Sequence, residues 1–357
     1  MKPSEHSVVA RFMRIEPFLL GTALSGLSSL AYSCSNVCLR WLAHCDPLLV
    51  SCIKAVPTLL VATTLVALSA ARGNMRWPSF PAFLGLAAVG VIAQLGGNGL
   101  FQWSMSEVGL ALTVPLCAGT MIIAASALAR VWLHEGVTPR SALALAILIT
   151  AIAVLSLGAE RAPQLAELAT ADASITAALS AACFSGVCYA ILNVTIRRLV
   201  TGDMPMHFVL STVSSVGVVS LGLAAIARTG WEPLAATELT DLGVMFIAGT
   251  FNAIGFFTLT KALQLVSIVQ VNAVSASQSA LAAMAGVAIF GESMTASLLV
   301  GVTLTIIGLT MVDRGKTIGR RPSGRRPAET PADEAFVAPP AGQLPDAAAL
   351  PREPTTT

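Results

Sequence analysis

Three large amide side chains, Gln94, Asn98 and Gln102, occur four positions apart in a stretch of sequence that is otherwise mainly apolar. Residues four apart share one face of an α-helix, so these amides form a stripe about 12 Å long at about 1.5 Å per residue. Amides both donate and accept hydrogen bonds and can therefore bind a polar solute. Because three amides on one face exceed what helix packing requires, we favour a polar cavity over a simple helix contact.

The spacing Tyr-x3-Asn occurs twice, at Tyr32 and Asn36 and again at Tyr189 and Asn193, 157 positions later. In each copy a serine precedes the tyrosine by four positions and extends the polar face by one turn. Polar residues also join helices in membranes by hydrogen bonds, so a purely structural role for any single serine stays open. Further candidates for binding a solute lie in the second half of the chain, at Asn252, Asn272 and Gln278.

Lys54 is the one formal charge well inside an apolar stretch, where a lysine costs about 2.5–3.5 kcal/mol on insertion scales. It could bind an anionic group or exchange a proton, or it could extend its amine to the membrane surface, and the sequence favours neither. His207 could titrate near neutral pH and take part in gating or coupling, although a lone histidine is more often structural. Trp103, beside Gln102, could form a gate or anchor its helix at the membrane interface.

The elements that must position these residues are membrane-spanning helices. The chain has 357 residues, of which 55% are hydrophobic and 11% charged, and its mean hydropathy is +0.77. An ordinary soluble domain has about 25% charged residues. Apolar runs long enough to cross a bilayer as helices occur ten times, and they lie at Pro17–Leu39, Pro47–Ala70, Phe80–Trp103, Val108–Trp132, Ser141–Gly158, Ser174–Ile196, Pro205–Ala227, Leu242–Leu259, Leu265–Phe290 and Met294–Val312.

The distribution of Lys and Arg predicts that both termini are cytoplasmic. With the polar segment 1–16 inside, the opposite side of the membrane holds only Arg40, Arg161 and Arg228. The first apolar run is longer than the core of a signal peptide and lacks a clear cleavage site, so we expect it to be retained. Residues 313–357 are rich in Pro, Ala, Gly and charge, which predicts a disordered cytoplasmic tail.

The chain contains an internal repeat of five helices. An offset of 157 aligns Tyr32 with Tyr189 and Glu135 with Glu292, and an offset of 158 aligns Gly97 with Gly255. Since five is odd, the second repeat enters the membrane from the opposite side, and the halves 17–159 and 174–312 are predicted to be inverted copies. Inverted repeats are typical of secondary transporters, whose binding sites lie near the midplane between the repeats. The fold class expected is therefore all-α, with ten transmembrane helices in two inverted five-helix repeats.

The doubled unit, the glutamate that closes the fourth helix of each half and the basic residue Lys54 together resemble the EamA-like transporters of the drug/metabolite transporter superfamily. The resemblance covers about residues 15–312. It implies a carrier, most simply an exporter, of small metabolites or drugs in a bacterial inner membrane, linked to a proton or another gradient. Family members often have a proline partway along the fourth helix of each half, whereas Pro115 lies early and "SASQSAL" has none.

Other classes of function find less support in the sequence. No metal-binding spacing, cofactor motif or catalytic constellation occurs, because "HEGVT" lacks the second histidine of a zinc helix and "RGKT" lacks the rest of a phosphate loop. The basic residues are spread out, which argues against nucleic acid as a partner. The expected partners are a small solute and the lipid bilayer, with a coupled proton and a homodimer left open. A non-transporting scaffold or sensor is the alternative, and an intramembrane enzyme is weaker still.

Overall fold

In the computed structural model, the residues whose structure is described are 5–133, 138–157, 173–202, 204–290 and 296–311. Every regular element in these ranges is a helix, as the apolar runs predicted. Several are long enough and apolar enough to cross a bilayer. Six such spans occur in the described part, at Pro47–Ala71, Phe80–Val108, Leu112–Trp132, Ser174–Thr201, Met206–Thr229 and Leu239–Leu265, with shorter apolar helices at Pro139–Val154 and Leu299–Gly308. The chain is therefore a multi-pass membrane protein.

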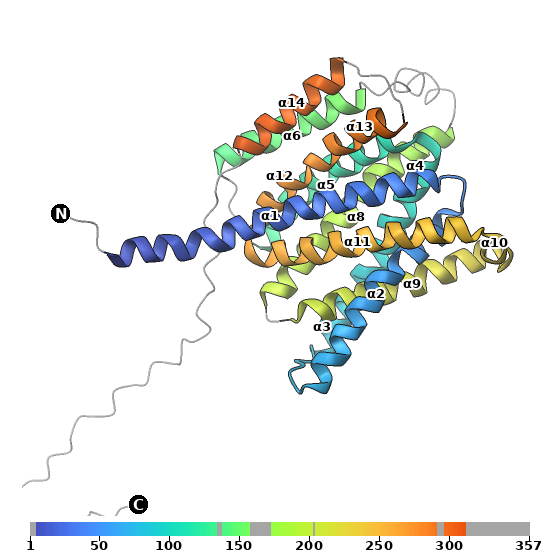
Figure 1. Ribbon diagram of the computed structural model, residues 1–357, viewed down its shortest axis with the longest axis horizontal. Helices are drawn as coiled ribbons and strands as arrows, with labels where there is room; N and C mark the ends of the chain where they lie inside the picture. The colour runs from blue at the N-terminus through green and yellow to red at the C-terminus, as the bar shows by residue number, and fades with distance from the viewer. Residues whose placement is uncertain (1–4, 134–137, 158–172, 203, 291–295, 312–357) are drawn as a thin grey trace, which may run out of the picture. The chain divides into compact units, whose positions relative to one another are not determined.

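The helices of the first half follow one another with short connections (Figure 1). Proline lies in the first turn of α2, α3 and α6, and Gly109 at φ 83° separates α4 from α5. Their bounds are α1 Glu5–Trp41, α2 Pro47–Ala71, α3 Phe80–Val91, the π-helix η1 Ile92–Gly99, α4 Leu100–Val108, α5 Leu110–Trp132 and α6 Pro139–Leu157.

The second half contains the remaining helices, and one of them is a single short turn outside the predicted spans. Their bounds are α8 Ala173–Thr201, α9 Met206–Thr229, α10 Glu232–Ala236, α11 Leu239–Leu265, α12 Ile268–Ser275, α13 Ser277–Phe290 and α14 Ala296–Met311. Two predicted features, the paired Glu135 and Glu292 and the tail 313–357, lie outside the described residues.

Two helices differ from the predicted spans. The first begins at Glu5 rather than Pro17, because hydropathy marks where a helix enters lipid and not where the helix itself begins. The predicted run Leu265–Phe290 is divided into α12 and α13 at Ala276. There the Ser277 hydroxyl donates to the carbonyl of Val274 at 2.7 Å, a local bond of the kind that competes with regular helix geometry.

The π-helix η1 coincides with the glycine-rich stretch of the third predicted span. Gly96 lies where a Cβ would come within 2.8 Å of the Cys188 sulfur, and Gly97 where it would come within 3.0 Å of the Tyr189 ring. The glycines therefore allow α8 to approach η1 closely.

Helices from the two halves are interleaved. α1 packs along α11, α8 packs on η1, α4 and α5, α2 packs on α9, and α6 packs on α14 (Figure 1). Large apolar side chains such as Leu60, Ile123 and Leu223 are more than half exposed, as expected for side chains that face lipid. The polar residues, in contrast, are gathered between the helices.

Candidate functional site

A cavity of about 140 Å³ lies between helices of both halves. Nine of the predicted site residues line it: Tyr32, Asn36, Lys54, Gln94, Asn98, Tyr189, Asn193, Asn252 and Gln278. The lining also includes hydroxyl and apolar side chains, which are Ser35, Ala55, Thr58, Phe101, Val114, Cys117, Ala118, Met121, Leu192, Val213, Ser214, Phe256, Leu259 and Ser275. This one site thus takes residues from α1, α2, η1, α4, α5, α8, α9, α11, α12 and α13.

Lys54 reaches this cavity from the first half of α2. The residue is only 4% exposed, so its amine lies in the interior of the described structure and not at its surface. Its Nζ donates to Oδ1 of Asn98 at 2.8 Å, and the Tyr189 hydroxyl donates to the same oxygen at 2.7 Å. An ammonium has three N–H donors, so Lys54 can still donate to a bound molecule.

Gln94 holds Asn98 in this orientation. The amide nitrogen of Asn98 donates to Oε1 of Gln94 at 2.6 Å, and Nε2 of Gln94 donates to the carbonyl of Val213 at 3.1 Å. Gly217 makes room for this arrangement, because a Cβ there would come within 2.7 Å of the Gln94 side chain. A continuous chain of hydrogen bonds therefore runs from α9 through η1 to the amine on α2 and the hydroxyl on α8.

The charge of the site is set by one residue. Among the described residues that line the cavity, Lys54 is the single formal charge, and no Asp or Glu accompanies it. The Phe101 and Tyr189 rings meet edge to face at 6.4 Å between centroids, beside the apolar side chains of Met121 and Phe256. The cavity therefore offers a cation and amides on one part of its wall and aromatic and aliphatic surface on another.

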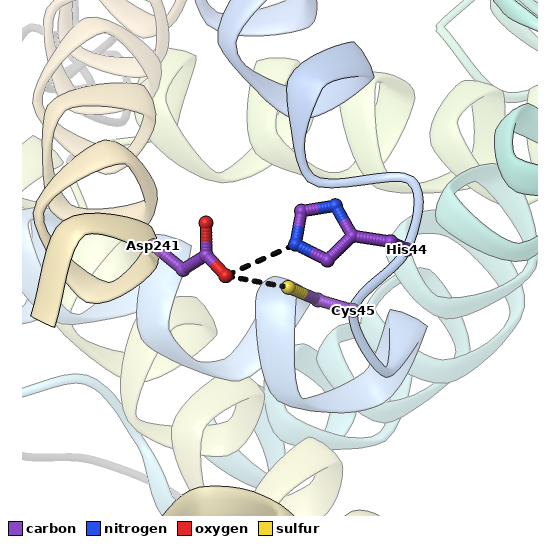
Figure 2. A group of neighbouring side chains, drawn as sticks. All are labelled: His44, Cys45 and Asp241. Atoms are coloured by element: carbon purple, nitrogen blue, oxygen red, sulfur yellow. Dashed lines mark hydrogen bonds and ion pairs between the residues drawn. The ribbon is translucent and has the colours of Figure 1, made fainter. Parts of the chain in front are cut away.

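A second polar cluster lies outside the cavity, where the connection from α1 to α2 meets the first turn of α11. His44 Nε2 lies 3.0 Å from Oδ2 of Asp241, and the Cys45 thiol donates to the same oxygen at 3.6 Å (Figure 2). Burial and the neighbouring carboxylates of Asp241 and Asp46 raise the pKa of the Cys45 thiol to about 11.

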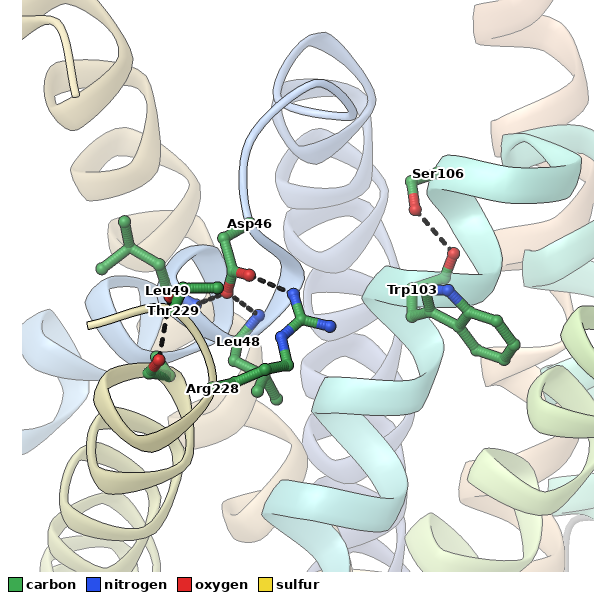
Figure 3. A network of polar contacts seen from close by, with 8 residues as sticks. Asp46, Leu48, Leu49, Trp103, Ser106, Arg228 and Thr229 are labelled. Atoms are coloured by element: carbon green, nitrogen blue, oxygen red, sulfur yellow. Dashed lines mark hydrogen bonds and ion pairs between the residues drawn. The ribbon is translucent and has the colours of Figure 1, made fainter. Parts of the chain in front are cut away.

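Asp46 fixes the beginning of α2 beside that cluster. Its Oδ1 accepts from the backbone N–H groups of Leu48 and Leu49 at 2.9 and 3.0 Å, and its Oδ2 pairs with Arg228 of α9 (Figure 3). One carboxylate thus caps a helix of the first half and holds the end of a helix of the second half.

Four predicted residues do not line the cavity. Gln102 is buried and donates to the carbonyl of Leu39 at 3.4 Å, and Asn272 is 1% exposed within α12. Trp103 packs beside the cluster of Val108, Leu112 and Ala178, and its carbonyl accepts from Ser106 (Figure 3). His207 lies in the first turn of α9.

Gln102 does not share the helix face with Gln94 and Asn98 that the sequence predicted, because the π-helix η1 precedes it. The spacing rule of an α-helix does not hold across a π-helical turn.

The hydroxyl residues of the lining were not predicted individually. Thr58 lies four residues after Lys54 on the same face of α2, and this spacing is a signal that could have identified it. Ser35 and Ser214 carry no comparable signal, because isolated serines are common at helix contacts in membranes.

Comparisons with known proteins agree with this architecture. A solved structure described only as a crystal structure of protein is similar in fold, with a TM-score of 0.61 and 15% sequence identity over 82% of this chain and 95% of the other. No curated protein sequence matches the chain. Residues 176–313 match the EamA-like transporter family, which confirms the expected resemblance over the second half. The chain is thus a multi-pass membrane protein whose residues 176–313 are similar to the EamA-like transporter family.

Proposed function

We propose that this protein is a secondary transporter that moves a small solute across the membrane by alternating access. The observation that carries the proposal is the polar cavity lined by helices of both halves, with Lys54 and Asn98 from the first and Tyr189 and Asn193 from the second. The moving parts are two inverted five-helix repeats, residues 17–159 and 174–312, which give ten transmembrane helices. Binding between repeats near the midplane is the arrangement that such carriers use.

Contacts repeated in the two halves support the inverted repeat. Gly97 of η1 faces the Tyr189 ring of α8, and Gly255 of α11 faces the Tyr32 ring of α1, with Cβ-to-ring distances of 3.0 and 3.1 Å. The offset of 157 relates Tyr32 to Tyr189, and the offset of 158 relates Gly97 to Gly255, so the two contacts join equivalent residues. Each half therefore places a glycine of its third helix under a tyrosine of the other half's first helix.

A second pair of contacts follows the same exchange. Ser29 donates to the carbonyl of Val274 at 3.4 Å, and Gly186 lies against the carbonyl of Cys117 at the corresponding positions. The repeat relates the packing of α1 on α11 to the packing of α8 on η1 and α4. It also relates α2 to α9 and α6 to α14, so each of these two contacts joins a pair of equivalent helices. Two halves related in this way can exchange conformations, which gives two oppositely facing states of similar energy.

The chemistry of the lining favours a solute with one anionic group and an apolar part, such as an amino-acid-like or other amphiphilic molecule. Lys54 can bind the anionic group, the amides can bind polar substituents, and Phe101, Met121 and Phe256 can contact the apolar part. A molecule with several phosphates would call for more than one cation. The resemblance favours export driven by a coupled proton across a bacterial inner membrane. The distribution of Lys and Arg favours a topology with both termini in the cytoplasm.

The test is solute flux into or out of proteoliposomes under an imposed pH gradient, with amino acids and other small molecules that carry one anionic group and an apolar part as candidate solutes. Gln94→Ala should abolish gradient-driven flux, because Asn98 loses the acceptor that orients it. Gln264→Ala is the matched control, since Gln264 accepts only from Lys261 near the surface in the described structure and should leave flux unchanged. Absence of flux for every solute, with folded and oriented protein, would favour the scaffold or sensor.

A further inference from the structure

Three side chains with metal-binding atoms meet at the end of the bundle where α1 ends and α11 begins. His44 and Cys45 lie in the connection between α1 and α2, and Asp241 lies in the first turn of α11 (Figure 2). The imidazole nitrogen, the sulfur and a carboxylate oxygen all lie within 4.8 Å of one another. Together they form a mixed N, S and O set, and Zn²⁺ is bound by these three ligand types.

The distances suit a tetrahedral ion. Zn²⁺ binds nitrogen and oxygen at about 2.0–2.1 Å and sulfur at about 2.3 Å, so tetrahedral angles separate the nitrogen from the oxygen by about 3.3 Å and the sulfur from the oxygen by about 3.5 Å. The corresponding distances to Oδ2 of Asp241 are 3.0 Å from His44 and 3.6 Å from Cys45. The nitrogen and the sulfur lie within 4.8 Å of each other, so an ion bound by all three atoms requires these two to approach by up to about 1.3 Å.

The surroundings of His44, Cys45 and Asp241 leave their ligand atoms available to a metal ion. The neighbouring carboxylate of Asp46 is already committed, because one oxygen caps α2 and the other pairs with Arg228. The side chains of His44 and Asp241 are 63% and 24% exposed, so solvent can deliver an ion and supply a fourth ligand. The cap formed by Asp46 also holds the backbone next to Cys45 in place.

We propose that His44, Cys45 and Asp241 form a binding site for one divalent transition-metal ion of the Zn²⁺ class, with water as the fourth ligand. Binding replaces the S–H bond of Cys45 by a sulfur–metal bond and releases the proton to solvent, without oxidation or reduction. The ion joins the connection between α1 and α2 to α11. The sequence shows no metal-binding spacing because Asp241 is 196 residues away from Cys45.

The test is metal binding by the purified full-length chain in detergent, first freed of metal. Zn²⁺ affinity is measured by competition with a chromogenic chelator, and Co²⁺ is used as a probe because a thiolate ligand gives it a charge-transfer absorption band. We expect one ion per chain. Cys45→Ser and His44→Ala should each weaken binding at least as much as the roughly 10- to 100-fold loss caused by changes around metal ligands. Cys45→Ser should also remove the absorption band.

Matched controls are Cys52→Ser and His207→Ala, which change the same residue types in α2 and α9 away from the cluster. Both should keep the affinity and the band. Unchanged affinity in Cys45→Ser and His44→Ala, or equal losses in the controls, would overturn the site and leave the hydrogen bonds to Asp241 as the role of the cluster. Because the readout is binding alone, this result does not depend on whether the protein transports a solute.

Discussion

The amine of Lys54 lies 2.8 Å from Oδ1 of Asn98, deep between helices and without a carboxylate among the described residues of the cavity wall. A buried amine with an amide partner has only partial compensation for the loss of water. A bound anion would supply the missing compensation.

The first prediction separates binding from stability at this position. Lys54→Met keeps much of the side-chain volume and removes the buried charge, while Asn98 keeps its hydrogen bond from Tyr189. We expect the melting temperature to stay equal or rise, because a lysine within the membrane costs about 2.5–3.5 kcal/mol. Flux of an anionic solute should nevertheless be lost, as measured in proteoliposomes.

Lys261→Met is the control for that variant. Lys261 is exposed near the end of α11 and bonds to Gln264 at 2.9 Å, so its replacement should change neither flux nor stability by a measurable amount. Undiminished flux in Lys54→Met would show that the amine does not contact the solute.

The second prediction concerns the two glycines that face tyrosines. Gly97→Ala should push the Tyr189 ring away from Asn98, and Gly255→Ala should push the Tyr32 ring in the equivalent place, because each new Cβ lies about 3.0–3.1 Å from ring carbons. We expect both variants to melt at lower temperature and to transport more slowly. Gly85→Ala meets nothing within 4 Å and should instead stabilise α3 by about 0.5–1 kcal/mol. Similar behaviour of all three variants would argue against the mirrored contacts.

The third prediction concerns the cap of α2. Asp46→Ala removes two backbone hydrogen bonds and the partner of Arg228, so unfolding should require about 1–2 kcal/mol less free energy. Arg228→Ala removes only the ion pair of a side chain that is 54% exposed, and exposed pairs contribute about 0–1 kcal/mol. Equal losses in the two variants would show that the ion pair, rather than the cap, stabilises this end of the bundle. Denaturant titration of the purified protein measures both.

The sequence allows much of the cavity to be predicted, since an amide or amine in an apolar helix must find polar partners away from lipid. Gln94, Asn98 and Lys54 were identified by that argument, and Tyr189 by the repeat. The argument fails where local geometry departs from the α-helix. Gln102 follows the π-helical turn and faces α1, and the run containing Asn272 breaks at Ala276.

The cluster at the end of the bundle illustrates a different limit. His44 and Cys45 are adjacent in sequence, but Asp241 belongs to a helix of the other half, and only the packing of α1 on α11 brings them together. Spacing rules detect ligands that share one element or motif. They cannot detect a set completed by tertiary contact.

The last prediction joins the metal site to the proposed transport cycle. An ion held by His44 and Cys45 from the first half and by Asp241 from the second would fix the two halves together at this end. Because alternating access requires helices of the two halves to move against one another, Zn²⁺ should slow flux in proteoliposomes, and a chelator should restore it. Cys45→Ser should transport normally and be insensitive to Zn²⁺, whereas Cys52→Ser should remain inhibited. Tight Zn²⁺ binding without inhibition would show that this end of the bundle does not open during transport, and equal inhibition of Cys45→Ser would place the inhibitory ion elsewhere.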